Sequence, residues 1–415
     1  MKDRSWNALT VLLGAAAMIA ALAIFAVYGA VLHRIAINAH GATGDFLSFY
    51  GAGFLVRTGR AAHLYDPATL EWAQRRLYPG SFDEAIGYPL PVFVAWCFAP
   101  LSLLPFTLSF FVFMGAMTLL LAGLVLTFRR ALVDVPPLPR NLFLAGAAFG
   151  MPSIASIVFG QVDLIALAGL TAGYLLLKDN RPRAAGIALA LVLVKPHMLL
   201  GVGLLLLVRR DWRALGSLAA VGLPLLIVPA LLSAPGALLD NMRIIASYPG
   251  AGKALSVNAA VMPNWRGFIV SLINNDSIWL WFPGFAAIAV AVAGAAVTRW
   301  RTAAFDQSYA LAAMLPLLVS PHVHTQNLVL LLLPGAILLR SYCGEGSSHV
   351  RELRAANALL LAYTIAFALP IIAILGLSLG VFPLLVFFGA LVTLWPHQAV
   401  VADTTKQTQV LARVA

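Results

Sequence analysis

One lysine of this sequence lies where a charge is costly, in the middle of a long apolar segment. Lys195 is followed by Pro196 and His197, and residues 184–208 contain no Asp or Glu. A lysine at membrane depth costs about 2.5–3.5 kcal/mol on insertion scales, so it needs an anionic partner. A lipid phosphate would serve, with Lys195 as the point charge and His197 as a hydrogen-bond donor. The alternative is a structural ion pair with a distant acid such as Asp163.

A carboxylate that could act as a general base occurs early in the chain. Asp45 lies in the stretch Gly44-Asp45-Phe46-Leu47-Ser48-Phe49-Tyr50, among small and aromatic residues. An acid in such apolar surroundings at a membrane surface can remove a proton from a substrate hydroxyl. The alternative is structural, because Asp before Phe-Leu-Ser-Phe is also a good helix N-cap.

Two histidines at positions i and i+2 form a third candidate group. His322 and His324 lie in Ser320-Pro321-His322-Val323-His324. This spacing is not a zinc pattern and no Cys or Glu cluster accompanies it, so we expect neither a metal nor another cofactor. Hydrogen bonding to a phosphate or to sugar hydroxyls fits the pair better, and a plain polar turn is the alternative.

Amide, aromatic, acidic and arginine side chains in the polar joints are candidates for substrate binding. Such residues suit stacking on a sugar and recognition of its hydroxyls, although Trp and Tyr are also routine at membrane interfaces and short polar joints also cap helices. The candidates are Tyr50, Tyr88, Gln161, Asp163, Asn264, Trp265 and Arg266.

The composition is that of a membrane protein. Of the 415 residues 61% are hydrophobic and 10% are charged, whereas soluble domains carry about 25% charged residues. This excludes a soluble cytosolic enzyme, a disordered chain and a nucleic-acid-binding domain. We interpret the net charge of +11 as topology signals and contacts to anionic lipid headgroups. Cys97 and Cys343 form neither a disulfide framework nor a metal-ligand spacing.

The elements that position these residues should all be α-helices. Continuous rather than alternating hydrophobicity excludes a barrel, so we expect one polytopic integral membrane domain over 1–415 with about 11–13 membrane segments. Short basic joints should be cytoplasmic. Simple spans are expected near 6–32, 141–158, 162–178, 214–232, 278–297, 306–319, 326–340, 356–376 and 380–397.

The polar joints should lie outside the membrane on the opposite side. The two largest are a first extracytoplasmic loop over 33–88, with interfacial helices that carry Asp45, and a second loop over 233–277. Two shorter joints surround residues 160–163 and 320–327.

Two segments do not fit as simple spans. Residues 184–208 have basic residues at both ends, and Lys195-Pro196 interrupts them in the middle, which predicts two half-length helices. Residues 89–128 are too long for one helix and contain Pro100 and Pro105. Broken helices at membrane depth line a protein or water-filled cavity, so both segments predict a cavity.

Together these motifs resemble glycosyltransferase family 87, the polytopic mannosyltransferase-like proteins of the C-type glycosyltransferase superfamily. Four stretches carry the resemblance, in the family's order: Gly44-Asp45-Phe46 to Asp66; Tyr88-Pro89 to Pro105; Gly160-Gln161 to Trp212 with Lys195-Pro196; and Ser320-Pro321-His322 with His324.

The resemblance implies the C-type glycosyltransferase fold and a polyprenyl-phosphate-linked sugar donor, often of mannose. It implies an inverting, usually metal-independent transfer to a lipid or glycan acceptor, with membrane lipids but no nucleic acid as further partners. Asp45 matches the family's catalytic base, Lys195 its Lys-Pro and His322 its late Ser-Pro-His region. The chain departs from many relatives in having Asp163 where they have Asn, and in its Pro-His-Val-His form.

We therefore expect an inner-membrane glycosyltransferase whose active site opens to the periplasmic side. Inverting transfer needs one base for the acceptor hydroxyl and cationic groups for the departing phosphate, which Asp45, Lys195, His197, His322 and His324 would supply. A transporter or flippase for a lipid-linked sugar is the rival from another class. A polymerase or ligase that uses a lipid-pyrophosphate-linked glycan is a further alternative.

Overall fold

The computed structural model describes residues 44–78, 85–247, 259–300, 304–343 and 380–393. The spans expected near 6–32 and 356–376 lie outside these residues, as do residues 33–43 and 79–84 of the first predicted loop and 248–258 of the second. Within the described residues every regular element is an α-helix or a 3-10 helix, which confirms the predicted all-helical class.

The first half of the chain supplies a run of short helices and one long one. Its elements are α2 (Phe46–Arg57), η1 (Ala61–His63), α3 (Pro67–Leu77), α4 (Val92–Phe98), η2 (Leu101–Leu103), α5 (Phe106–Ala131), α6 (Pro137–Phe149), α7 (Met151–Val158), α8 (Asp163–Lys178), α9 (Pro182–Leu189), η3 (Ala190–Val194), η4 (Pro196–Leu199) and α10 (Leu200–Val208).

The second half alternates long helices with short connections. Its elements are α11 (Trp212–Ser233), α12 (Ala237–Ser247), η6 (Ala259–Val261), α13 (Trp265–Ile273), α14 (Ile278–Trp300), α15 (Phe305–Val319), η7 (Thr325–Leu331), α16 (Leu332–Cys343) and α18 (Val381–Thr393).

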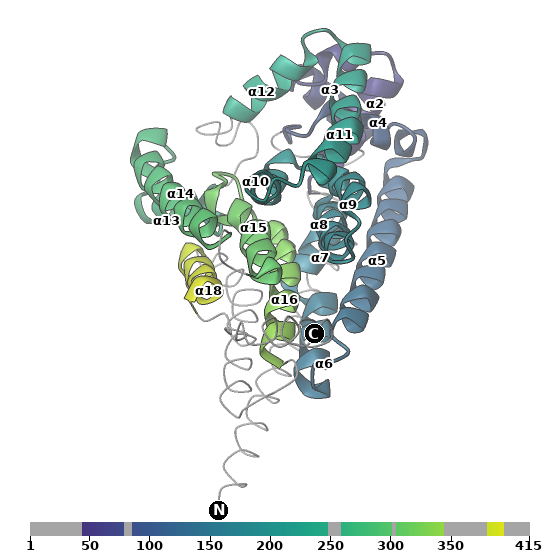
Figure 1. Cartoon of the computed structure of the whole chain (residues 1–415). Helices are drawn as coiled ribbons and strands as arrows, with labels where there is room; N and C mark the ends of the chain where they lie inside the picture. Colours follow the sequence, from purple (N-terminus) through teal and green to yellow (C-terminus); the bar gives the residue numbers. More distant parts are fainter. Residues whose placement is uncertain (1–43, 79–84, 248–258, 301–303, 344–379, 394–415) are drawn as a thin grey trace, which may run out of the picture.

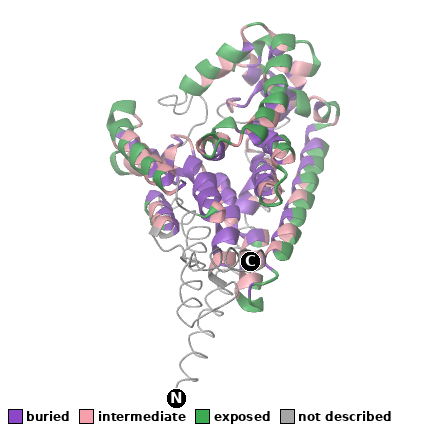
Figure 2. Cartoon of the chain, in the orientation of Figure 1, coloured by how far each residue is buried: buried purple, intermediate pink, exposed green. Residues whose placement is uncertain are grey.

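Four helical stretches of the described residues are long and apolar enough to cross a membrane. They are α5, the pair α6–α7 over Pro137–Val158, α11 and α14. The 26 residues of α5 extend about 39 Å at 1.5 Å per residue, which exceeds the hydrocarbon thickness of a bilayer. In Figure 2, α5, α11 and α14 expose much of their length, whereas the middle of the molecule is buried. Large apolar side chains facing outward are expected where the surrounding solvent is lipid.

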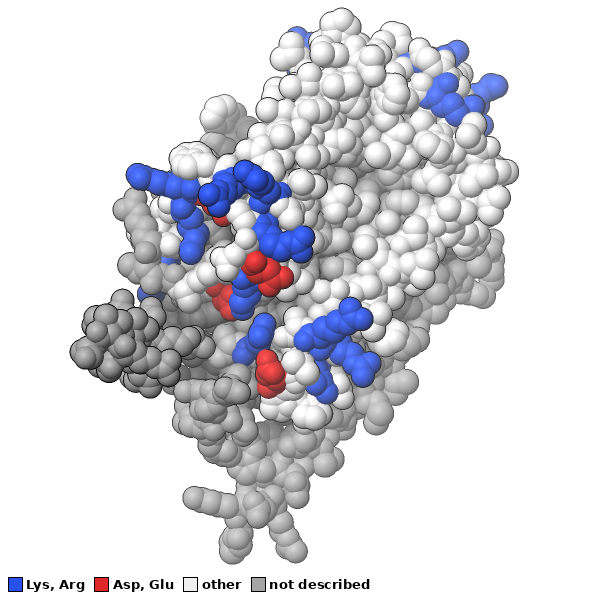
Figure 3. Space-filling model, turned by 45° about the vertical axis from the view of Figure 1, so that its right-hand side comes forward, with Lys and Arg blue, Asp and Glu red and all other residues white. Residues whose placement is uncertain are grey.

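The charged side chains are concentrated at helix ends. Arg129 and Arg130 end α5, Lys178 ends α8, and Arg209 and Arg210 follow α10. Figure 3 shows the resulting groups of charge, with a broad uncharged area between them. An uncharged band between charged ends is typical of a helical membrane protein.

The segment 184–208 is broken where its sequence predicts. Helix α9 tightens into η3, the chain turns at Lys195 with φ −136° and ψ 81°, and η4 then leads into α10. Proline has no N–H to continue a helix, which explains the break before Pro196. The two halves, Pro182–Val194 and Pro196–Val208, are each too short to span a membrane alone.

Helix α15 is the centre of the bundle. Every residue from Gln307 to Leu318 is buried, and α15 packs against α10, α14, α16 and α18 (Figure 2). Small residues allow the closest approaches. A Cβ atom on Gly201 of α10 would lie 1.9 Å from the Ala312 carbonyl oxygen of α15. Helices in membranes associate through such close contacts of small residues, because burial of apolar surface provides little drive there.

Helices α2, α3 and α4 form a compact unit at one end of the bundle (Figure 1). Phe46, at the start of α2, packs against Phe98, Phe106, Phe110 and Phe113 with ring centroids 5.2–6.0 Å apart. This aromatic cluster joins α2 to α4 and α5. It therefore fixes the helix that follows Asp45 to one of the membrane-spanning helices.

Candidate functional site

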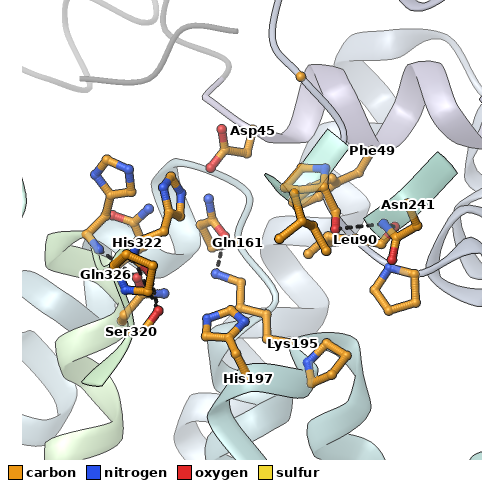
Figure 4. Close-up of a pocket in the computed structure, with 18 of the residues that line it drawn as sticks. Asp45, Phe49, Leu90, Gln161, Lys195, His197, Asn241, Ser320, His322 and Gln326 are labelled. Atoms are coloured by element: carbon orange, nitrogen blue, oxygen red, sulfur yellow. Dashed lines mark hydrogen bonds between the residues drawn. The ribbon is translucent and has the colours of Figure 1, made fainter. Parts of the chain in front are cut away.

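A cavity of about 290 Å³ lies where the first polar loop, the broken helix and the histidine joint meet (Figure 4). Its lining residues are Asp45, Phe49, Ile86, Gly87, Pro89, Leu90, Pro91, Gln161, Lys195, Pro196, His197, Asn241, Ile245, Arg266, Ser320, Pro321, His322, His324, Gln326 and Asn327. Seven of the twelve candidate residues are among them, from five separate parts of the chain.

Two glycines with positive φ bring Asp45 to this cavity. Gly44 has φ 47° and Gly160 has φ 65°, and residues other than glycine rarely adopt a backbone conformation in this region. A Cβ atom on Gly44 would lie 2.7 Å from the Phe159 backbone, and one on Gly160 would lie 2.3 Å from the Phe46 Cβ. The turn before α2 therefore rests directly on the turn before α8. This contact places Asp45 beside Gln161.

The Asp45 carboxylate does not cap its helix. Asp45 occupies the N-cap position of α2, but its side chain accepts no capping hydrogen bond. Asp66 and Asp211 do cap, each accepting a backbone N–H three residues further on, at 3.0 and 3.2 Å. The capping alternative for Asp45 is thus not realised. In Figure 4 its carboxylate points into the cavity.

Asp45 lies outside the four membrane-spanning stretches, and its environment alters its acidity. Burial raises the pKa of the Asp45 carboxyl to about 6; the Lys195 ammonium opposes this rise and the Asp163 carboxylate adds to it. A carboxylate with a pKa near 6 is ionised at pH 7 and is a stronger base than an ordinary aspartate.

Lys195 forms an ion pair with an acidic side chain of the protein. Its Nζ lies 2.9 and 3.0 Å from the two carboxylate oxygens of Asp163, and it also donates to Gln161 Oε1 at 2.9 Å. Asp163 is fully buried, whereas Lys195 is 7% exposed and lines the cavity. The ion-pair alternative is therefore present, and it neutralises the lysine at the cavity wall.

The same carboxylate also holds the histidine joint. Asn327 donates from Nδ2 to Asp163 Oδ1 at 2.8 Å, and its Oδ1 accepts the His324 backbone N–H at 2.7 Å. Asp163 thus joins the broken helix at Lys195 to the start of η7. Asp163 does not itself line the cavity, so it shapes the site through its neighbours.

His322 and His324 lie in the joint between α15 and η7, with ring centroids 4.7 Å apart. Burial lowers the pKa of His324 to about 4 and that of His322 well below its usual value, and nearby positive charge acts in the same direction. Both rings are neutral at pH 7, so each offers one N–H donor and no net charge.

Arg266 is a fully buried cation at the cavity edge. Its guanidinium forms a two-pronged ion pair with Asp276 and lies over the Trp281 ring, 5.3 Å from the centroid. Fork-shaped pairing with a carboxylate fixes the guanidinium plane as well as its charge. Like Lys195, Arg266 therefore reaches the cavity with a counter-ion already attached.

Four candidates have structural contacts and do not line the cavity. Tyr50 donates its hydroxyl to the Leu104 carbonyl and Tyr88 to the Pro91 carbonyl. Asn264 caps α13 and donates to the Ser320 carbonyl at 3.1 Å. Trp265 packs against Phe268.

The cavity also contains residues that were not singled out from the sequence. Phe49 follows Asp45 by one helical turn, so the helical period could have indicated it. Gln326 and Asn327 belong to the same polar joint as the two histidines. Ile245 comes from α12, and no motif in the sequence indicates this residue. Asn241 of the same helix has an amide of the kind expected to recognise sugar hydroxyls.

Comparison with known families assigns the chain to a family. The model of glycosyltransferase family 87 matches residues 88–321, which is more than half of the chain. The chain belongs to glycosyltransferase family 87. It is therefore a membrane glycosyltransferase that takes a sugar from a donor to an acceptor, as the resemblance of its motifs predicts. No curated protein and no solved structure matches the chain. The matched range includes Lys195 and His197, whereas Asp45 precedes it and both His322 and His324 follow it.

Proposed function

We propose that this family 87 glycosyltransferase moves a sugar, mannose in the first instance, from a polyprenyl-phosphate donor to an acceptor hydroxyl, with inversion and with Asp45 as the base. The observation that carries the proposal is the Asp45 carboxylate, which makes no cap and faces a cavity lined on another side by Lys195 and three histidines. A donor that is itself a lipid suits an enzyme whose site is surrounded by apolar helices.

The bond changes balance with these residues. Asp45 takes the proton of the acceptor hydroxyl while the acceptor oxygen bonds to the anomeric carbon of the sugar. The bond from the anomeric carbon to the phosphate oxygen breaks, and the lipid phosphate leaves with the electron pair. The donor carries one negative charge and the departing phosphate two, so one negative charge develops beside the donors of the cavity.

Lys195, His197, His322 and His324 are the groups proposed to meet that phosphate. Since Asp163 already neutralises Lys195 and the two joint histidines are neutral, they would act mainly as directed hydrogen-bond donors. Preorganised donors in a site that excludes water stabilise developing charge more strongly than the same groups in water. The cavity needs no net positive charge in its resting state for this role.

The proposed compartment follows from the distribution of charge. Arg129, Arg130, Lys178, Arg209 and Arg210 occupy helix ends, and we assign these ends to the cytoplasm. The cavity is lined by the joints assigned to the other side. We therefore propose an inner-membrane protein with its active site facing the periplasm.

The test is sugar transfer from radiolabelled polyprenyl-phosphate-mannose to a total lipid extract, by the purified wild type and by Asp45→Asn. The amide keeps the size of the side chain but cannot accept a proton at neutral pH. We expect transfer by the wild type and a loss of 100-fold or more in the variant, since a positioned base contributes about 10²–10⁴-fold. Asp66→Asn, which removes the charge of a helix cap, is the matched control and should retain transfer.

Other outcomes would point elsewhere. Transfer that survives in Asp45→Asn would remove Asp45 from the mechanism. Protein-dependent movement of the lipid-linked sugar across a vesicle membrane without bond cleavage would favour a transporter. Transfer only from a lipid-pyrophosphate-linked oligosaccharide would favour a polymerase or ligase.

A further inference from the structure

The outer surface of the α2–α3 unit carries a group of arginines that the cavity does not use. Arg57 ends α2, Arg60 follows it, and Arg75 and Arg76 lie in the last turn of α3; none of them lines the cavity. In Figure 3 blue side chains gather at the upper end of the molecule, where Figure 1 places α2 and α3, with no red beside them in this view. Lysine and arginine are concentrated on the cytoplasmic side of membrane proteins, whereas α2 and α3 are assigned to the other side. A cluster of arginines here therefore calls for a ligand.

Two aromatic rings bring three of the arginines together. Phe54 of α2 and Trp72 of α3 lie with their ring centroids 6.2 Å apart. The Arg57 guanidinium lies 5.3 Å from the centroid of Phe54. The guanidinium groups of Arg60 and Arg76 lie 4.2 and 5.8 Å from the centroid of Trp72. We call these five side chains the arginine–aromatic patch.

The charges of this patch are not neutralised by the described part of the protein. Of the four arginines, Arg75 alone has a carboxylate partner among the described residues, Glu71 at 2.7 Å. Arg57 donates from Nε to a neutral group, the Ser102 hydroxyl, at 2.9 Å. An aromatic ring contacts the face of a guanidinium, while the N–H donors lie around its edge. The patch thus keeps three positive charges whose remaining N–H donors can bind an anion from outside.

The patch adjoins a surface that faces lipid. The bond from Arg57 to Ser102 connects it to η2, where the next residue, Leu103, is 69% exposed. Helix α5 begins shortly after η2 and is long and apolar enough to span the membrane, and its Phe111 is 62% exposed. The arginines therefore lie beside the end of a membrane-spanning helix. A phospholipid has the same order of groups, a phosphate followed by apolar chains.

We propose that the arginine–aromatic patch binds the phosphate of an anionic phospholipid, whose acyl chains lie along Leu103 and α5. The guanidinium fork matches the oxygens of a phosphate in geometry as well as in charge. Trp72 is 39% exposed, and its ring suits the boundary between headgroups and acyl chains. A zwitterionic headgroup would add a cation beside three arginines. An acidic protein would match the charge of the patch but not the apolar surface that adjoins it.

This lipid site is separate from the proposed site of sugar transfer. Helix α2 has 12 residues, so its end at Arg57 lies about 18 Å along the helix from the end that begins after Asp45. The proposal needs α2 and α3 to lie at a membrane surface and does not use the transfer chemistry. The site therefore stands or falls independently of the reaction.

The experiment measures lipid binding to the full-length protein in uncharged maltoside micelles, by native mass spectrometry, with phosphatidylglycerol and phosphatidylcholine of the same acyl chains. We expect phosphatidylglycerol to bind at least tenfold more tightly. Because each basic residue near an anionic surface contributes about fivefold, the double variant Arg60→Gln, Arg76→Gln should bind it about 25-fold more weakly. The matched control is Arg75→Gln, Arg243→Gln, which removes two charges that are already ion-paired and should stay within about twofold of wild type.

A second variant separates a built site from general attraction of charge. Trp72→Leu keeps every charge and removes the ring beside Arg60 and Arg76, so it should weaken binding about threefold, the size of an exposed cation–π contact. It also decides the matter if the double arginine variant fails to fold. Equal losses in the two double variants, or equal binding of the two lipids by wild type, would overturn the proposal. Displacement of the lipid by millimolar glycerol phosphate would also overturn it and assign the patch to a soluble phosphate.

Discussion

The protein contains two lysine–aspartate pairs of the same chemistry in two different environments. Lys195 and Asp163 meet at 2.9 Å with side chains that are 9% and 0% exposed. Lys178 and Asp306 meet at 2.8 Å with side chains that are 34% and 29% exposed. Each lysine also donates to one neutral side chain, Gln161 for Lys195 and Tyr174 for Lys178.

The comparison shows that the distance between the two charges of an ion pair does not determine what the pair does in the protein. The exposed pair joins the end of α8 to the start of α15, where water can solvate either partner alone. The buried pair has no such alternative, so each of its members depends on the other. Burial also makes Lys195 available to a ligand only through the cavity.

The largest expected difference between the pairs is in stability. Asp163→Asn leaves the Lys195 ammonium buried without its counter-ion and should lower the free energy of unfolding by about 3–5 kcal/mol. Asp306→Asn at the exposed pair should cost about 0–1 kcal/mol. Denaturant titration in mixed micelles measures both values, and equal losses would show that burial does not separate the two pairs.

The next largest difference is in catalysis. Lys195→Met removes a proposed donor to the departing phosphate and should reduce kcat by about 100-fold, as the loss of a single preorganised donor does. Lys178→Met should stay within about twofold of wild type, because Lys178 is at the opposite end of α8 from Asp163 and does not line the cavity. Radiolabelled transfer at saturating donor measures both. A similar loss in both variants would mean that general unfolding, rather than the site, explains the effect.

The two neutral side chains that accept hydrogen bonds from the lysines, Gln161 and Tyr174, should also differ in their effect on catalysis. Gln161→Leu removes one hydrogen bond to Lys195 inside the site, an interaction worth about 1 kcal/mol, so kcat/KM should fall about fivefold. Tyr174→Phe removes the 3.3 Å contact to Lys178 and should leave kcat/KM unchanged. Initial rates at low donor concentration provide the measurement, and an unchanged Gln161→Leu enzyme would contradict a positioned Lys195.

The smallest expected effect is on the pH profile. With the pKa of Asp45 raised to about 6, the wild-type kcat/KM should fall as the pH drops through 6, because the base becomes protonated. Three influences act on the pKa of Asp45: burial, the Lys195 charge and the Asp163 charge. The Asp163 charge is the weakest of them, and because it is negative it raises the pKa of Asp45. Asp163→Asn should thus move the acid limb to lower pH, while Asp306→Asn leaves it in place. If the acid limb of Asp163→Asn moved to higher pH instead, Asp163 would lower the pKa of Asp45 rather than raise it.

Much of the fold and part of the site could be predicted from local patterns. Continuous hydrophobicity predicts helices because lipid leaves the backbone no other partner, and the Lys195-Pro196 break follows from the missing N–H of proline. The segment 89–128 is also broken, but the structure uses its start at Pro89–Pro91 for the cavity and leaves Pro100 and Pro105 outside the lining.

Which residues meet at the site depends on packing between distant segments. Asn241 reaches the site because it bonds to Pro89 and Leu90, about 150 positions earlier, and a periodicity in one segment carries no such information. Tyr88 and Trp265 have residue types that suit sugar recognition, yet their side chains contact other parts of the protein and do not line the cavity. Residue type indicates what a side chain can do, whereas tertiary contacts decide what it faces.

The contact between the turns at Gly44 and Gly160 has a consequence for how loss of activity should be interpreted. A single added methyl group, as in Gly160→Ala, would collide with the Phe46 Cβ that lies 2.3 Å from its position. Such a variant keeps every polar side chain of the cavity but moves the helix that begins just after Asp45. An inactive protein with an intact set of chemical groups would result, and a mutational survey confined to ionisable residues would never encounter it.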